Sequence, residues 1–327
     1  MGSRTRTGLQ FDLDGTTLRA LGRYGPILGL VGLYVLFASM TDRFLSYRNQ
    51  LNILRQVSII GILAIASTFP ILCAEIDLSI AQMMEFTGLL IAALATGSLV
   101  GGEMPVVVAV IAGFGAALTL GGVSGYITSR FEAPSFMTTL AMLFLADGLG
   151  LIVSENRPII GLPESLMWLG SGSTFGFPNI ALTFLVLLVV SQLILSRTRL
   201  GLYIYAVGGD REAAERMGVN VRLIRMGVLV ISAGLTVIAG IVMLGRIGSA
   251  IPTMGNNLLL PPIAAVILGG ANLFGGSGNM IGTLVGVLIL GVLSNGLNLL
   301  GVDPAGQLVA QGIVLMIAVL ANVIGRK

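Results

Sequence analysis

Residues 226–245 read MGVLVISAGLTVIAGIVMLG, a run of twenty residues with no charge between Arg225 and Arg246. A helix needs about 20 mostly apolar residues to cross the hydrocarbon core of a bilayer. Similar apolar runs recur along the 327 residues, of which 55% are hydrophobic and 10% are charged. A soluble domain has about 25% charged residues, so this chain has too few to cover a globular surface. The sequence therefore predicts an all-α polytopic membrane protein.

The apolar runs predict about ten transmembrane helices, some of them short or broken by glycine or proline. We expect them at residues 26–41, 57–73, 79–97, 104–128, 136–153, 178–196, 226–245, 258–271, 279–300 and 305–324. A polar N-terminal tail over residues 1–25 precedes one transmembrane domain over residues 26–327. The tail has no apolar core followed by a small-residue cleavage site, so we expect no signal peptide.

The basic residues predict the orientation of the helices. If the N-terminus is cytoplasmic, 13 of the 18 basic residues face the cytoplasm and five, namely Arg43, Arg48, Arg55, Arg157 and Arg246, face outward. This bias matches the positive-inside rule, and an even number of spans then places both termini in the cytoplasm. The stretch at 42–56, DRFLSYRNQLNILRQ, is predicted to lie on the outer interface as an amphipathic helix.

The longest cytoplasmic segment of this topology is the loop at residues 197–225. Gly208 and Gly209 interrupt its first part, and Asp210 is a favourable N-cap for a short helix with Glu212 in the first turn. Gly218 is expected to end that helix. Such an isolated helix either lies on the membrane surface or docks on a partner, and the sequence favours docking.

The residue inventory excludes several kinds of chemistry. The chain has no histidine, and its only lysine is Lys327, so it cannot form the phosphate-binding loop of an ATPase. Cys73 is the only cysteine, which rules out a disulfide within the chain and leaves no set of ligands for zinc. We expect no catalytic residues, no metal and no cofactor in this chain. Energy for transport would come from an ion gradient or from a separate ATPase.

Four acidic residues near the spans are relevant to that choice, because charges at bilayer depth are costly and usually functional. They are Glu75, Asp77, Glu85 and Asp147. An ion-coupled transporter would use such carboxylates as proton or sodium sites. Alternatively, Glu75 and Asp77 lie where water reaches the end of a span, and Asp77 caps the next helix. Glu85 lies a turn or more inside its span, so the second explanation does not fit it.

Two helix breaks resemble each other faintly. Residues 76–79, IDLS, and residues 272–277, NLFGGS, each precede a glycine-containing apolar run. Paired breaks in the two halves of a transporter often mark the substrate path. Chance similarity between two glycine-rich membrane segments explains the match equally well.

Four segments together resemble the membrane permease of bacterial ribose-type ABC importers, from about residue 26 to the end of the chain. They are EIDLSI at 75–80, APSFMTTLAMLFLADGLGLIVSENRPIIGLP at 133–163, TRLGLYIYAVGGDREAAERMGVN at 198–220 and AAVILGGANLFGGSGNMIGTLVGVLILGVLSNGLNLLG at 264–301. That family also serves arabinose, xylose, galactose and autoinducer-2.

The resemblance implies a multi-pass protein of the bacterial inner membrane that works with partners. These are a second permease copy or a paralogue, a periplasmic sugar-binding protein, and a cytoplasmic ABC ATPase that binds the ATP and Mg. Glu212, Ala213, Ala214 and Gly218 match the E-A-A-x-x-x-G pattern by which such permeases engage the ATPase. The implied ATPase-coupling residues are Gly208, Gly209, Asp210, Glu212, Ala213, Ala214 and Gly218.

The sequence departs from the family pattern at three places. Cys73-Ala74-Glu75 stand where two glycines usually precede Ile-Asp-Leu-Ser, and Ala81-Gln82 replace a Gly-Ser-like pair. Residues 258–262, LLLPP, stand where the family has an acidic residue, and resemble the autoinducer-2 and deoxysugar branches. These departures leave the identity of the sugar open.

The leading hypothesis is import of a monosaccharide, a pentose or similar small polyol, from periplasm to cytoplasm by alternating access. A neutral sugar favours a polar, mostly uncharged path with apolar gating surfaces. The predicted path residues are Asp77, Ser79, Gln82, Phe136, Asn272, Phe274, Asn295 and Asn298. Each asparagine could instead bond a neighbouring helix.

Three other functions stay open at this stage. One is an ion-coupled secondary transporter that uses Asp77 and Glu85 as coupling sites. Another is a channel or scaffold without energy coupling, which leaves the capped helix unexplained. Within the leading class, a permease for nucleosides or branched-chain amino acids is also compatible with the sequence.

Overall fold

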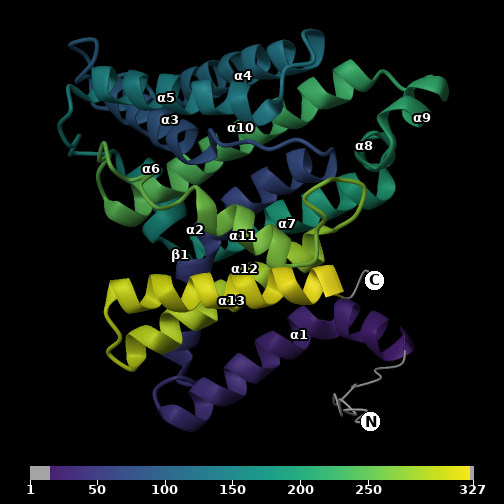
Figure 1. Ribbon diagram of the computed structural model, residues 1–327. Coiled ribbons are helices and arrows are strands. Elements are labelled where there is room, and N and C mark those ends of the chain that lie inside the picture. The colour runs from purple at the N-terminus through teal and green to yellow at the C-terminus, as the bar shows by residue number, and fades with distance from the viewer. Residues whose placement is uncertain (1–14, 325–327) are drawn as a thin grey trace, which may run out of the picture.

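The structure, a computed structural model, describes residues 15–324 as a helical bundle with one short hairpin (Figure 1). The thirteen helices in this range are α1 (Gly15–Met40), α2 (Tyr47–Leu72), α3 (Ile80–Ala95), α4 (Val106–Arg130), α5 (Ser135–Ser154), α6 (Glu164–Ser171), α7 (Asn179–Arg197), α8 (Arg199–Gly209), α9 (Arg211–Arg216), α10 (Val221–Ile247), α11 (Leu260–Leu268), α12 (Met280–Leu299) and α13 (Pro304–Ile324). The hairpin pairs β1 (Ser173–Thr174) with β2 (Phe177–Pro178) in antiparallel register.

Each of the ten predicted spans coincides with a helix, which confirms the all-α membrane fold. Six helices in the described range are long and apolar enough to cross a bilayer, namely α2, α4, α5, α7, α10 and α12. The 16 residues of α3 and the nine of α11 are shorter than a full crossing, which takes about 20 residues. A count of ten complete crossings therefore does not follow from helix length alone.

Two predicted boundaries differ from the structure. The predicted interfacial helix at 42–56 does not form separately, because α2 runs without a break from Tyr47 to Leu72. Its first turns are held by the buried side chain of Asn49, which donates to the Phe44 carbonyl oxygen at 2.8 Å. At the N-terminus, α1 already begins at Gly15, inside the predicted tail at 1–25. Residues 1–14 of that tail lie outside the described residues.

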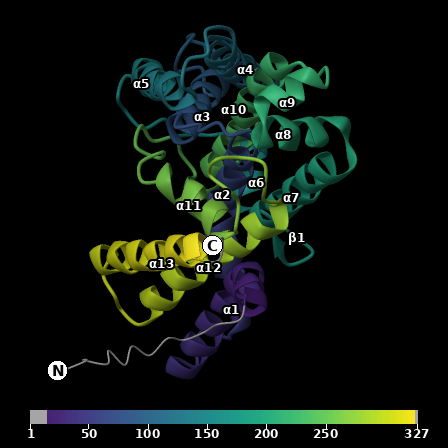
Figure 2. The same cartoon turned by 45° about the vertical axis from the view of Figure 1, so that its right-hand side comes forward.

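The central helix of the bundle is α10, which packs against α2, α3, α4 and α6. Val228 and Val242 on α10 belong to a core shared with α2, α7, α11 and α12. Ala233 and Val237, also on α10, belong to a second core with α3, α4 and α5. Figure 2 shows the two groups on opposite sides of α10, with α1 and α13 beyond α12. Apolar side chains on different faces of one helix thus join the two halves.

Glycines bring α11 and α12 into close contact. A Cβ at Gly286 would collide with the Ala265 carbonyl oxygen, and one at Gly269 would collide with the Gly282 backbone. Small residues of this kind let membrane helices approach until their backbones touch. The glycine-rich composition is therefore used in packing at this interface.

The two ends of the bundle differ in their connections. At one end, α6 and the hairpin lie across the bundle, and residues Ile159 and Ala250 pair by two backbone hydrogen bonds. At the other end lie α8 and α9, the start of α1 and the last turns of α13 (Figure 1). We call the second the α9 end.

Candidate functional site: the α9 end of the bundle

The short helix α9 forms as the sequence predicts. Asp210 precedes it in extended conformation, and its Oδ1 accepts a hydrogen bond from the Ala213 N–H at 3.0 Å. This cap satisfies one of the amides that a helix leaves unpaired at its start. Gly218 follows the helix with φ +82°, a left-handed conformation that glycine adopts without strain. On α9 itself, Glu212, Ala213 and Arg216 are exposed.

The end of α8 fixes where α9 begins. Gly208 is buried, and a Cβ there would collide with the Leu72 carbonyl oxygen at the end of α2. The Gly276 N–H donates to that same oxygen at 3.0 Å. The Tyr205 hydroxyl donates to the Gly278 carbonyl oxygen at 2.7 Å, and burial raises the pKa of this tyrosine. Thus α8 is seated on the end of α2 and on the 269–279 loop.

Residues 73–79 form the break between α2 and α3, and two hydroxyls of α5 hold their backbone. The Ile76 N–H donates to Ser135 Oγ at 2.9 Å, and the Leu78 N–H donates to Thr139 Oγ1 at 3.1 Å. Thr139 also donates to the Ile76 carbonyl oxygen at 3.1 Å. A buried irregular segment needs such partners, because its peptide groups are not paired within a helix.

Asp77 is buried in the same break, with only 5% of its surface exposed. Its Oδ1 accepts hydrogen bonds from the Ser79 N–H at 2.9 Å and the Ser79 hydroxyl at 2.6 Å. Its Oδ2 accepts one from the Ser232 hydroxyl of α10 at 2.7 Å. Asp77 therefore fixes the start of α3 to α10, and the alternative in which water reaches this carboxylate is wrong.

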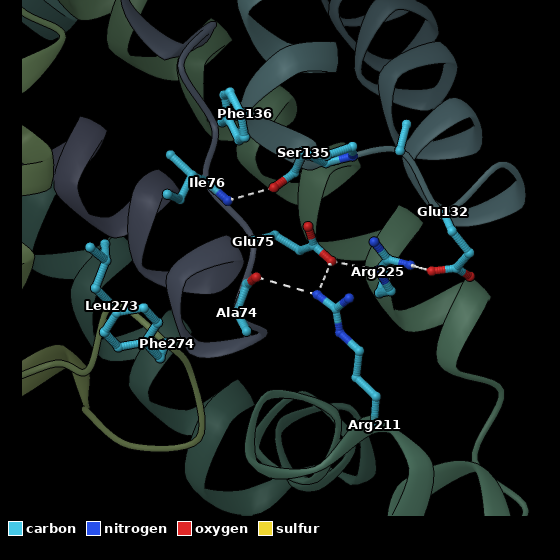
Figure 3. A pocket seen from close by; sticks show the side chains of 12 residues that line it. Ala74, Glu75, Ile76, Glu132, Ser135, Phe136, Arg211, Arg225, Leu273 and Phe274 are labelled. Carbon is cyan, nitrogen blue, oxygen red and sulfur yellow. Dashed lines mark hydrogen bonds and ion pairs between the residues drawn. The ribbon is translucent and has the colours of Figure 1, made fainter.

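Glu75 is at the centre of a cluster of four charged residues (Figure 3). Its Oε1 accepts a hydrogen bond from Arg211 Nη2 at 2.8 Å and one from Arg225 Nε at 2.5 Å. Arg225 Nη1 also donates to Glu132 Oε2 at 2.5 Å. The side chains of Glu75 and Arg225 are only 2% and 3% exposed. Buried charges are costly unless they are paired, and here each of the two has the opposite charge beside it.

The sequence did not reveal this cluster. Arg211 and Arg225 entered the sequence analysis only as charges that set the topology, and Glu132 was not considered. Glu75 was named either as a candidate ion-coupling carboxylate or as a residue that water reaches. The residues that pair are 93 to 150 positions apart, which follows no motif, and the folded helix bundle brings them together. The available signal was an acidic residue directly before Ile76-Asp77-Leu78-Ser79, where the family usually has glycine.

A pocket of about 430 Å³ opens beside the charge cluster. Glu75, Arg211 and Arg225 form part of its wall, while Phe136 of α5 and Phe274 of the 269–279 loop contribute aromatic rings (Figure 3). Phe136 is 44% exposed and Phe274 is 80% exposed. The two predicted gating phenylalanines therefore line one pocket at the α9 end.

The other predicted path residues lie in several places. Asn272 donates to the Gly275 carbonyl oxygen at 3.0 Å and shapes the 269–279 loop. Asn295 is buried in α12, where its amide pairs with Asn49 of α2, and Asn298 is exposed one turn later. Asn272 thus lies in the loop at the α9 end, whereas Asn295 and Asn298 lie near the other end of α12.

Two polar side chains of α3 lack partners for one oxygen each. Gln82 Oε1 and Glu85 Oε1 are buried without a hydrogen bond among residues 15–324. Glu85 Oε2 does accept one from the Gly255 N–H at 2.7 Å, which fixes the connection between α10 and α11 to α3. Within the described chain, no group of three or more acidic or cysteine residues could hold a metal ion.

Comparisons with known proteins agree on one kind of protein. Residues 49–319 match the family described as branched-chain amino acid transport system / permease component. The chain is 39% identical over 302 residues to the ribose import permease protein of Bacillus subtilis, covering 92% of each chain. It is 36% identical over 300 residues to that of Escherichia coli K12, covering 90% of this chain and 92% of the relative.

A fructose import permease protein of Rhizobium meliloti is 34% identical over 304 residues, covering 90% of this chain and 83% of the relative. No solved structure is significantly similar to the chain.

Proposed function

We propose that the chain, which belongs to the branched-chain amino acid transport system / permease component family, is the membrane subunit of an ABC importer. We propose further that the imported substrate is a monosaccharide. Permeases of this family are transport components and not enzymes, and they work with an ATPase and a substrate-binding protein. The chain is accordingly a multi-pass inner-membrane protein. The substrate is a pentose or similar small polyol, which moves from periplasm to cytoplasm by alternating access.

The observation that carries this proposal is the exposed face of α9. Glu212 and Ala213 of the E-A-A pattern are exposed, and Met217, directly after the helix, is 85% exposed. Ala214 is buried at 4% and holds the helix against the bundle. A capped helix that presents an apolar residue beside charged ones suits a partner protein, and we assign the ATPase to this face.

The same arrangement supports the proposed orientation. The start of α1, the last turns of α13, α8 and α9 are all at the α9 end (Figure 1). If the ATPase binds α9, this end faces the cytoplasm together with both termini. The bias of the basic residues points the same way. We therefore propose ten passes, of which the short helices α3 and α11 are broken ones.

The identity of the substrate rests on the relatives. Two relatives named for ribose and one named for fructose favour a sugar, whereas the family description names branched-chain amino acids. An amino acid is a zwitterion and needs partners for both charges, whereas the charged residues at the α9 end pair with one another. The names of the relatives are therefore the main support for a sugar.

Uptake by the reconstituted complex tests the proposal. The permease, its cognate ATPase and its binding protein are placed in liposomes and offered labelled ribose, xylose, fructose or leucine. We expect uptake of a sugar that needs ATP and survives a protonophore. Uptake of leucine alone would replace the sugar with an amino acid. Uptake that stops with the proton gradient while ATP remains would favour the ion-coupled alternative.

A further inference from the structure

Arg211 is the charged residue of α9 that faces the body of the protein. Glu212 and Arg216 on the same helix are exposed and pair with each other at 3.0 Å. Arg211 instead reaches the break between α2 and α3, where its Nη2 donates to Glu75 Oε1 and, at 3.3 Å, to the Ala74 carbonyl oxygen. The helix that we assign to the ATPase is thus attached to residues 73–79 by one side chain (Figure 3).

Glu75 connects this attachment to the transmembrane helices. The oxygen that accepts from Arg211 also accepts from Arg225 in α10, and Arg225 continues to Glu132 between α4 and α5. Hydrogen bonds between ionised groups are roughly twice as strong as neutral ones. One carboxylate therefore joins α9, the 73–79 break and α10, with the α4–α5 connection attached through Arg225.

The two contacts of Glu75 differ in burial. Glu75 and Arg225 are both nearly inaccessible to water, so parting them would leave an uncompensated buried charge. Arg211 is 41% exposed, and water can solvate its guanidinium if it moves away. The Arg211 contact is therefore the one that a substitution can remove without leaving a buried charge unpaired, because Arg225 still pairs with Glu75.

We propose that Glu75 is a positioning residue that passes movement of α9 to the 73–79 break and, through it, to α3 and α5. This inference rests on the proposed function, in which the ATPase binds α9. The break is suited to the role because its backbone is bonded to Ser135 and Thr139 of α5, while Asp77 bonds Ser232 of α10. A rigid element held at several points moves as a unit, which is how domain motions are passed on.

Cys73 offers a readout that does not depend on the sugar. It is the only cysteine of the chain, it is fully buried, and it lies two residues before Glu75 at the end of α2. The rate at which a membrane-permeant maleimide labels Cys73 reports movement of the break. The rate is measured on the permease–ATPase complex in proteoliposomes, without nucleotide and after trapping with ATP and orthovanadate.

The main variant is Arg211→Gln, because it removes the half-exposed partner and leaves the buried pair intact. Arg130→Gln is the matched control, since Arg130 is exposed at the end of α4 at the same end of the bundle. We expect trapping to change labelling of the wild type and of Arg130→Gln by about tenfold, within the usual range of coupling between sites, and that of Arg211→Gln by about twofold or less. ATP hydrolysis by Arg211→Gln persists while its sugar uptake falls.

A double variant tests whether Arg211 acts through Glu75. If it does, Glu75→Gln with Arg211→Gln loses no more uptake than Glu75→Gln alone, because the ion pair between Arg211 and Glu75 is already lost. Losses that add overturn the inference, as does a nucleotide response of Arg211→Gln equal to that of the wild type. A wild type that imports sugar with ATP but shows no Cys73 response also overturns it and leaves the proposed function standing. Absence of ATP-driven uptake in the wild type contradicts the proposed function itself.

Discussion

Asn49 and Asn295 exchange two hydrogen bonds between their side-chain amides, at 2.9 and 3.0 Å, across a sequence separation of 246 residues. Both residues are buried, at 7% and 2%, and the pair joins the start of α2 to α12. Asn295 was predicted as part of the substrate path, with an interhelical hydrogen bond as the alternative. The observed pairing matches the alternative, so we now expect Asn295 to act on stability.

Asn295→Ala is expected to lower the stability of the protein and leave the affinity for sugar unchanged. The substitution removes the two hydrogen bonds between Asn49 and α12 and leaves the Asn49 side chain bonded only to the Phe44 carbonyl oxygen. Hydrogen bonds between membrane helices average about 0.6 kcal/mol, with values up to about 1.7 kcal/mol. Thermal unfolding in detergent, followed by size-exclusion chromatography, measures the effect. Asn298→Ala is the control, because Asn298 is exposed on the same helix. A raised KM for uptake with unchanged Tm would contradict the structural role.

Asp210→Ala is expected to weaken assembly with the ATPase. The Asp210 carboxylate accepts a hydrogen bond from the Ala213 N–H in the first turn of a helix of only six residues. Loss of such a cap costs about 1 kcal/mol, which corresponds to about fivefold in affinity if the helix must be formed to bind. Asp210→Ser keeps a capping oxygen and should retain most of the affinity. Co-purification of the ATPase with the permease at graded concentrations measures the difference.

The helices could be predicted from sequence because membrane spans and caps are local patterns. The run at 226–245 falls within α10, and Asp210 caps α9 where expected. A helix within residues 42–56 was also predicted, but its continuity with the span that follows was not. That continuity depends on Asn49 and Phe44 being buried against other helices, and no local pattern encodes such tertiary contacts.

The candidate site was predictable only in part. Phe136 and Phe274 were named as gating surfaces and do line one pocket, whereas the charge cluster beside them went unseen. Arginines at span ends serve orientation in most membrane proteins, so Arg225 gave no sign that its side chain is buried against Glu75. An ion pair between residues 150 apart is a property of the folded bundle.

Substitutions at Gly218 should follow the energetics of left-handed backbone conformation. The residue has φ +82°, and a Cβ there would meet nothing within 4 Å. A substitution therefore changes the energy of the backbone conformation and causes no steric clash. Non-glycine residues lose about 1–2 kcal/mol in this region, asparagine less than most, and β-branched residues fit it worst. We expect Gly218→Asn to keep most ATP-driven uptake, Gly218→Ala less, and Gly218→Val least. The same order should hold for recovery of the ATPase with the permease, while expression in the membrane stays similar.

Substitutions at Glu85 distinguish an ATP-driven importer from an ion-coupled transporter. Its Oε2 accepts a hydrogen bond from the Gly255 N–H, which a neutral amide oxygen can also do. If Glu85 only holds the α10–α11 connection, Glu85→Gln keeps this bond and retains most uptake, whereas Glu85→Ala leaves a buried N–H unpaired at a cost of about 1–3 kcal/mol. If Glu85 instead carries a proton or sodium ion, glutamine cannot replace it, because its amide does not ionise. Uptake by both variants, measured with ATP in the presence and absence of a protonophore, decides between the two roles. We expect Glu85→Gln to show near-normal uptake in the presence of the protonophore. Loss of uptake in this variant would instead indicate that the Glu85 carboxylate couples transport to an ion.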